Sequence, residues 1–375
     1  MRSPAYEASR ERKCQDGEVD QVPDLDELLD AARVVAIPTR TRFRGIAVRE
    51  AVLFEAPKGA SEFSPFTEYD DREASAWLAA AIEFGWGALP PVTRERIAVN
   101  ATVPAVTPAE VPDILARFPG CRTVKVKVAE RGQSLADDVA RVRAVREAAG
   151  TDALIRIDAN GGWTVEEAVP ALLALAEFDL DYAEQPCMSV PELAEVRRLT
   201  TDQKVGDSNP PSSARPDSNP EPADTGSPLV RIAADESVRK AEDPLAVARA
   251  GAADLLIVKA QPLGGIARTL DIVSQAGLPV VVSSALDTSV GIAMGLHLAA
   301  ALPEGSLAGA CGLGTVALLA GDVTADPLLP VNGELPVRRP ILDPRLLEEH
   351  RAAPEREEWW RERIARCHAL LAPAA

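Results

Sequence analysis

The chain has 375 residues, 46% of them hydrophobic, and is longer than one ordinary domain needs unless it forms a large α/β barrel. Its net charge of −17 argues against nucleic acids and anionic membranes as partners, and it means that an anionic substrate needs a local group of cations. The five cysteines are scattered without a Cys-x-x-Cys pair and the first residues carry no apolar signal segment, which predicts a cytoplasmic protein without a zinc site or a disulfide framework.

The N-terminal part of the chain predicts a small α+β unit. Residues 1–24 are polar and unpatterned, which is typical of a disordered extension. The Arg-rich stretch 39–44 is interpreted as a loop between two strands. We expect a helix, two strands, a third strand or loop, and a second helix over residues 25–32, 33–37, 46–55, 59–65 and 73–84.

From residue 97 onward, short apolar runs alternate with amphipathic helical stretches. This rhythm indicates a parallel sheet covered on its outer face, and eight strands fit a closed α/β barrel. An open doubly wound sheet is the alternative, but no Gly-rich phosphate loop follows the first strand. The Pro-, Ser- and Asp-rich residues 202–228 interrupt the rhythm and predict an inserted, disordered loop. The expected strands are 97–103, 123–128, 154–158, 180–184, 230–235, 254–259, 279–284 and 307–311.

Two lysines alternate with valines in the second of these strands. Lys125 and Lys127 therefore lie on one face of the strand. Their repulsion is roughly 2–3 kcal/mol at an effective dielectric near 20, which is enough to push one of them toward the neutral amine that a general base requires. The alternative is an edge strand whose lysines lie in water and protect the sheet edge.

Acidic residues end three consecutive strands. Asp158, Glu184 and Asp235 lie at the carboxyl ends, where barrels collect their functional residues. Each alone could be a helix N-cap, but together they favour a divalent ion that prefers oxygen ligands, Mg²⁺ or Mn²⁺. Lys259 ends the sixth strand, across the barrel from the second. This arrangement suits removal of a proton α to a metal-bound carboxylate.

Together these motifs resemble the enolase superfamily, in the branch with a Lys-x-Lys pair on the second strand and a lysine on the sixth. Within it the likeness is greatest to the o-succinylbenzoate synthases of actinobacterial type. The resemblance implies a (β/α)7β barrel over residues 96–325 with an α+β capping domain over 25–95, completed by 326–375. The residues that carry it are Phe43 to Gly45, Glu62 to Phe66, Lys125 to Lys127, Asp158 to Asn160, Glu184 to Pro186, Ala234 to Ser237, Lys259 and Ser283 to Ser289.

The resemblance also implies roles for these residues. Mg²⁺ would bind Asp158, Glu184 and Asp235. Lys127 would be the base with Lys125 as its electrostatic partner, and Lys259 would stabilise the enediolate from the other side. Substrate contacts would come from residues near the metal and at the end of the seventh strand, namely Arg156, Asn160, Ser283 and Ser284. The loop 40–44 would act as a lid.

The implied reaction is the syn dehydration of 2-succinyl-6-hydroxy-2,4-cyclohexadiene-1-carboxylate, a small anionic carboxylate, to 2-succinylbenzoate in menaquinone biosynthesis. The nearest alternative is an N-acylamino acid racemase, which uses the same metal and both lysines. Dipeptide epimerisation is disfavoured, because the eighth strand ends without paired aspartates. A Schiff-base aldolase acting through Lys259 and a catalytically silent binding protein are more remote alternatives. The sequence leaves the oligomeric state open.

Overall fold

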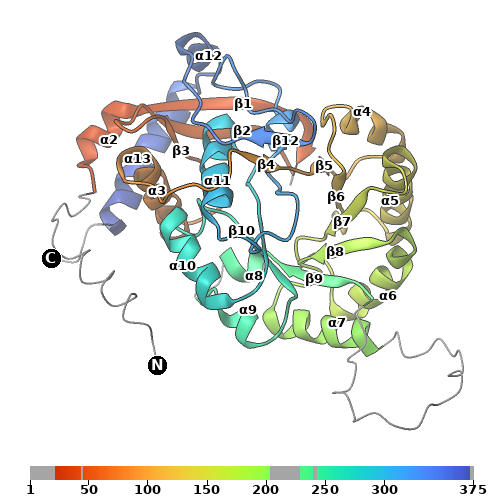
Figure 1. Ribbon diagram of the computed structural model, residues 1–375. Helices are drawn as coiled ribbons and strands as arrows, with labels where there is room; N and C mark the ends of the chain where they lie inside the picture. The colour runs from red at the N-terminus through yellow and green to blue at the C-terminus, as the bar shows by residue number, and fades with distance from the viewer. Residues whose placement is uncertain (1–21, 44, 203–228, 240–242, 372–375) are drawn as a thin grey trace, which may run out of the picture.

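The computed structural model describes most of the chain (Figure 1), namely residues 22–43, 45–202, 229–239 and 243–371. The predicted disordered extension 1–24 lies outside these ranges except for its last three residues. The predicted inserted loop 202–228 lies outside them except for Asp202, which ends a helix. Residue 44, part of the expected lid, also lies outside them.

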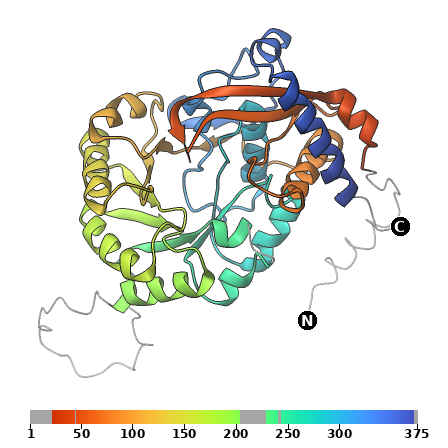
Figure 2. The same cartoon turned by 180° about the vertical axis from the view of Figure 1, so that it is seen from behind.

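The N-terminal part forms an antiparallel sheet that helices cover on one side (Figures 1 and 2). Its strands lie in the order β1-β2-β3, and Asp24 and Asp70 cap the helices α2 and α3 by accepting bonds from Glu27 N and Glu73 N. The C-terminal helix packs here too, with Trp360 edge-on to Phe63 at 5.7 Å. The elements of this cap are α2 (Leu25–Ala31), β1 (Ala32–Phe43), β2 (Ile46–Phe54), β3 (Ser61–Phe63), α3 (Asp71–Trp86) and α13 (Pro354–Leu371).

For the described residues 39–43 the expected loop is wrong, because β1 continues through Phe43 and β2 begins at Ile46. Thr and Arg alternate in this stretch, and the arginines are exposed while the threonines are partly buried. Such two-residue alternation with β-branched threonines favours a strand. The pairing with β2 shifts register between Pro38 and Phe43, so the tip of this hairpin is irregular.

The middle of the chain forms the predicted parallel barrel. Seven strands pair in the order β11-β10-β9-β8-β7-β6-β5. Residues 307–312 take the eighth position, with parallel bridges from Leu307 to Val280 and from Cys311 to Val99. The strands are β5 (Ala101–Val103), β6 (Thr123–Lys127), β7 (Leu154–Asp158), β8 (Leu180–Glu184), β9 (Arg231–Ala234), β10 (Leu255–Val258) and β11 (Val280–Val282).

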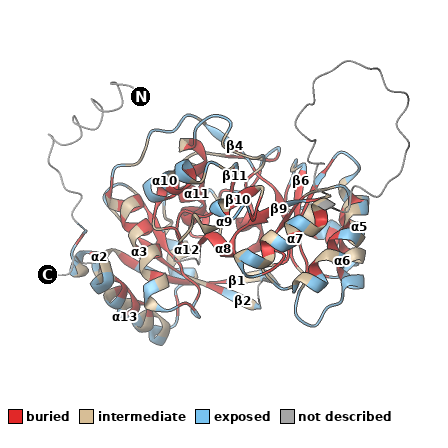
Figure 3. Ribbon diagram, turned by 90° about the horizontal axis from the view of Figure 1, so that it is seen from below, coloured by how far each residue is buried: buried red, intermediate tan, exposed pale blue. Residues whose placement is uncertain are grey.

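Helices cover the outer face of this barrel, and buried residues fill the space between the layers (Figure 3). Ser134 and Thr164 begin α5 and α6 with capping boxes, which explains where these helices start. The outer helices are α4 (Val111–Leu115), α5 (Leu135–Ala149), α6 (Val165–Leu175), α7 (Val190–Asp202), α9 (Ala246–Arg249), α10 (Ile266–Ala276) and α11 (Ser289–Ala301). The short helix α8 (Glu236–Arg239) is buried instead, directly after β9.

Two short elements differ from expectation or lie outside the repeating pattern. The first expected barrel strand is split into β4 (Arg96–Ala98), which pairs antiparallel with β12 (Glu334–Pro336), and β5, which belongs to the barrel. The helix α12 (Pro344–Glu349) follows β12. Within the described residues, none of the helices combines the length and the apolar character needed to cross a membrane.

Candidate active site

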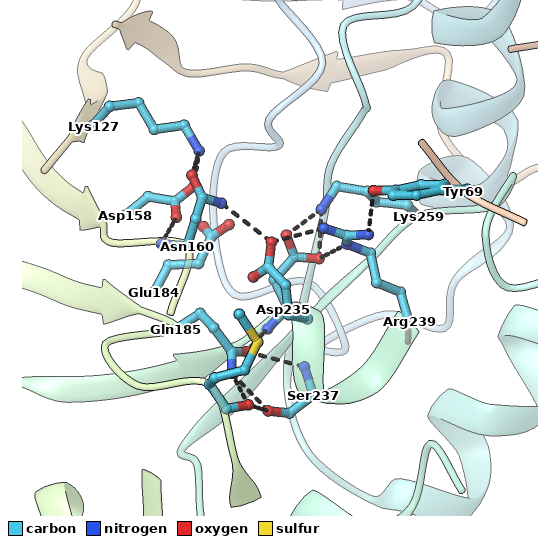
Figure 4. A network of polar contacts seen from close by, with 12 residues as sticks. Tyr69, Lys127, Asp158, Asn160, Glu184, Gln185, Asp235, Ser237, Arg239 and Lys259 are labelled. Carbon is cyan, nitrogen blue, oxygen red and sulfur yellow. Dashed lines mark hydrogen bonds and ion pairs between the residues drawn. The ribbon is translucent and has the colours of Figure 1, made fainter. Parts of the chain in front are cut away.

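Three lysines line the cavity at the mouth of the barrel, and Figure 4 shows two of them, Lys127 and Lys259, on opposite sides. Lys125 and Lys127 lie on β6 and are each 8% exposed, while Lys259 directly follows β10 and is 7% exposed. Because β6 pairs with β5 on one side and β7 on the other, the edge-strand interpretation of these lysines is wrong. Three strands separate β6 from β10, which places the two lysine-bearing walls across the barrel.

The three acidic residues lie between these walls. Asp158 ends β7, Glu184 ends β8 in register with it, and Asp235 directly follows β9. Lys125 Nζ lies 3.0 Å from both Asp158 Oδ2 and Glu184 Oε1. Lys127 Nζ lies 2.5 Å from Asp158 Oδ2. Lysine ammonium groups therefore bridge these carboxylates, which do not serve as helix caps.

Charge compensation differs from residue to residue in this cluster. Burial raises the pKa of Glu184 to about 8, and Asp158 adds to the rise. Burial also opposes ionisation of Asp158, but Lys127 and Lys125 outweigh it and hold the pKa of Asp158 well below its usual value. Burial lowers the pKa of Lys259. Burial also acts to lower the pKa of Lys125. The carboxylates of Glu184 and Asp158 outweigh burial and raise that pKa well above its usual value, so repulsion from Lys127 does not make Lys125 neutral.

This donor set fits a divalent cation. Within the described residues no three His, Cys, Asp or Glu side chains already form a ready-made metal cluster. Instead, the Lys125 ammonium stands in for a cation between Asp158 and Glu184, and the Lys259 ammonium does so at Asp235, 2.5 Å from Oδ2. Buried carboxylate oxygens without soft ligands are the donors that Mg²⁺ and Mn²⁺ prefer.

A cavity opens beside these groups, between the barrel mouth and the cap. Asn160, Ser283 and Ser284 line it as expected. The sequence reasoning missed Phe66 and Trp77, which reach the cavity from the cap, and Arg239. Its remaining lining residues are Thr102, Lys125, Lys127, Asp158, Asp235, Lys259, Ala285, Gly312 and Thr315.

Arg156 does not line this cavity, contrary to the expectation that it lies close to the substrate. It shares the inward face of β7 with Asp158 but lies one layer deeper in the barrel. There its Nε donates to Asp181 at 2.8 Å and Nη1 donates to the Ala310 carbonyl at 2.6 Å. It is fully buried, so its contacts tie the barrel interior together below the site.

A further residue, Arg239, connects this site to the cap. Its Nε donates to Asp235 Oδ1 at 3.1 Å, Nη2 donates to Glu236 at 2.7 Å, and Nη1 donates to the hydroxyl of Tyr69 at 3.1 Å. Arg239 lies four residues after Asp235, so helical spacing could have found it. No local pattern points to Tyr69, which lies 170 residues away in the sequence.

The fold and site together define a class. Residues 34–85 match the family described as enolase N-terminal domain-like, and residues 113–207 and 222–340 match the enolase C-terminal domain-like family. These matches cover more than half of the chain. They agree with the capped barrel and with the three acids and three lysines that its strands carry. The chain belongs to the enolase superfamily.

Similarity to known proteins narrows the class. The o-succinylbenzoate synthase of Mycobacterium tuberculosis (strain ATCC 25618 / H37Rv) is 53% identical over 354 residues, which cover 94% of this chain and 98% of the relative. This places the chain among the o-succinylbenzoate synthases, a family of lyases.

Two solved structures show the same fold at low sequence identity. The muconate lactonizing enzyme from Pseudomonas fluorescens is 20% identical with a TM-score of 0.66, and the match covers 86% of this chain and 98% of that one. The N-succinyl Arg/Lys racemase from Bacillus cereus is 16% identical with a TM-score of 0.65, covering 86% and 97%. At these identities the likeness concerns the fold alone.

Proposed function

We propose that this enzyme dehydrates 2-succinyl-6-hydroxy-2,4-cyclohexadiene-1-carboxylate to 2-succinylbenzoate in menaquinone biosynthesis, with Mg²⁺ as cofactor. The observation that carries the proposal is the pair Lys127 and Lys259, which approach one cavity from opposite walls with three buried carboxylates between them. The 53% identity to the mycobacterial synthase supports the choice of substrate. We assign the cap to residues 25–95 and 326–375, and the barrel to 96–325. A cytoplasmic location stays a prediction.

Asp158, Glu184 and Asp235 would hold the ion. When bound, Mg²⁺ supplies positive charge that stabilises the substrate carboxylate as its α-proton leaves. Mn²⁺ has the same ligand preference and is the natural substitute. A divalent cation and a dianionic substrate carry opposite charges of equal size, so together they leave the net charge of the site unchanged.

Lys127 is the base in this proposal. Its Nζ lies on the cavity, where Asp158 Oδ2 and Asn160 Oδ1 hold it at 2.5 and 2.7 Å. A syn elimination needs one group that takes the proton and returns it to the departing hydroxyl on the same face. Lys127 can do both, while Lys125 stays charged between two carboxylates and keeps the local potential positive.

Lys259 stabilises the developing negative charge from the opposite wall. Burial lowers its pKa, and Asp235 accepts its hydrogen bonds. Ser283 and Ser284 line the same cavity as Lys259, and in this proposal they contact the succinyl tail. The Ser284 hydroxyl lies 2.8 Å from that of Thr315 and donates to the Gly312 carbonyl at 2.9 Å, which fixes its position.

The test is a spectrophotometric dehydration assay on the purified protein with Mg²⁺. We expect turnover that disappears in Lys127→Ala and in Lys259→Ala, while calorimetric Mg²⁺ binding persists in Lys127→Ala. A wild-type protein that binds Mg²⁺ but does not turn over this substrate would contradict the proposal.

Racemisation of N-acylamino acids is the second candidate, because lysines on opposite faces of a substrate suit it. Turnover on both substrates separates the two functions, and dehydration should be far faster. A Schiff-base aldolase would instead be trapped on Lys259 by borohydride and would keep its activity in EDTA.

A further inference from the structure

The guanidinium of Arg239 is shared among three partners in a buried position (Figure 4). Asp235 and Glu236 belong to the barrel, whereas Tyr69 belongs to the cap. Arg239 is only 7% exposed, so water cannot readily replace a lost partner. Because a guanidinium is a rigid, planar fork, a change in one of these bonds shifts the direction of the others.

Tyr69 is held firmly on the cap side. Its ring packs against Phe66 and Trp77, at centroid distances of 5.5 and 6.2 Å, and both of these rings line the cavity. Its backbone carbonyl accepts a hydrogen bond from Arg363 of α13, which is 1% exposed. The hydroxyl of Tyr69 therefore occupies a place that the packing of the cap determines.

On the barrel side, the bonds of Arg239 lead to both reacting walls. One bond holds Asp235 Oδ1, which also accepts from Lys259. The other holds Glu236 Oε1, which accepts from Asn160 Nδ2 at 3.2 Å, and Asn160 Oδ1 in turn accepts from Lys127 Nζ at 2.7 Å. A continuous set of hydrogen bonds thus runs from the cap to both sides of the cavity.

We propose that Tyr69 is a positioning residue: its hydroxyl orients Arg239, and through Arg239 it fixes the carboxylate of Asp235, so that docking of the cap sets the geometry of the metal site. This inference rests on the proposed function, in which Asp235 binds Mg²⁺. Without the Tyr69 hydroxyl, a buried N–H of Arg239 loses its acceptor, and the guanidinium turns toward another one. Asp235 and Glu236 then move with it.

The direct test is Tyr69→Phe, which keeps the ring and its packing but removes the hydroxyl. We expect the Mg²⁺ dissociation constant, measured by calorimetry without substrate, to rise roughly tenfold, the lower end of the effect seen when partners of metal ligands are removed. The matched control is Trp86→Phe, which removes the bond from Trp86 Nε1 to Glu27 within the cap. The control should bind Mg²⁺ like the wild type.

Stability and positioning are separated by two measurements. In EDTA, the thermal midpoint of Tyr69→Phe should fall no further than that of Trp86→Phe. In a double-mutant cycle with Arg239→Lys, the effects on Mg²⁺ affinity should be clearly less than additive, because both substitutions disrupt the same set of bonds. General destabilisation would instead give additive effects.

An unchanged Mg²⁺ affinity in Tyr69→Phe, or additive effects in the cycle, overturns the inference while leaving the proposed function intact. If neither the wild type nor the Trp86→Phe control binds Mg²⁺, the proposed function itself fails and the inference fails with it. The wild-type titration therefore tells the two failures apart.

Discussion

Glu62 of β3 provides the sharpest test of the electrostatics between cap and barrel. It is fully buried, and its carboxylate accepts bonds from the Ser64 and Thr288 hydroxyls at 2.6 and 2.5 Å and from the Gly291 backbone N–H at 3.0 Å. Burial, with a further contribution from Asp287, raises its pKa from an ordinary 4.5 to about 7. Arg49 is the nearby cation, with Nη2 3.8 Å from Asp287 Oδ1.

The perturbation is Glu62→Gln. The pKa of this acid is higher in the folded state than in the unfolded chain, so its stabilising contribution is full below pH 4.5 and is lost as the pH rises through 7. The shift of about 2.5 pKa units corresponds to about 3 kcal/mol in total, most of which is lost between pH 5 and pH 8. Glutamine keeps acceptor and donor atoms in place but does not titrate. Relative to wild type, Glu62→Gln should therefore gain about 2–3 kcal/mol in free energy of unfolding over this range.

The assay is urea unfolding in EDTA at pH 5, 6, 7 and 8, followed by circular dichroism. Glu50→Gln is the matched control on the neighbouring strand β2. There, bonds from Arg356 and Trp360 outweigh burial and lower the pKa of Glu50, so its contribution is present at neutral pH and is lost as the pH falls toward and below its usual value. Because this loss occurs below pH 4.5, the difference between the control and wild type should stay flat from pH 5 to pH 8. A flat difference between Glu62→Gln and wild type across this range would refute the reasoning.

Three other predictions follow from the same structure. Saturating Mg²⁺ should raise the thermal midpoint and EDTA should reverse the rise, because a ligand that binds only the folded state stabilises it; an unchanged midpoint would count against the metal site. Arg141→Met should lower the free energy of unfolding by about 3–5 kcal/mol in urea, because it leaves buried Asp138 without its ion pair; Arg143→Met, at an exposed ion pair, should change it by less than about 1 kcal/mol. Gly120→Ala should also destabilise the fold, since Gly120 has a φ of +79° and the new Cβ would lie 2.5 Å from the backbone Cα of Asn332, and a thermal midpoint equal to that of wild type would show that the backbone there relaxes freely.

Much of the barrel could be predicted because its physical rules are local. Strand periodicity assigns Lys125 and Lys127 to one face, and the carboxyl ends of parallel strands must meet at one rim, which brings Asp158 and Glu184 together. The depth of a side chain within the barrel could not be predicted in this way, because it depends on the relative stagger of neighbouring strands. Arg156 has the right face but the wrong depth, and a single sequence carries no signal for that stagger.

The contacts of the cap show a different limit, because they join residues far apart in the chain. Glu62 reaches the start of α11 and Glu83 accepts from the first N–H groups of α10, across more than 180 residues in each case. With Tyr69 on Arg239, these bonds attach the cap to the elements that follow β9, β10 and β11. The opposite side is built differently: a second cavity lies beneath the β1–β2 hairpin tip, and its lining, which includes the exposed Arg42 and Glu130, reaches Lys127 and Asn160. The wall that carries Lys259 is thus hydrogen-bonded to the cap through several elements, while Lys127, the proposed base, lines a cavity together with Arg42 and Gly45 of the hairpin.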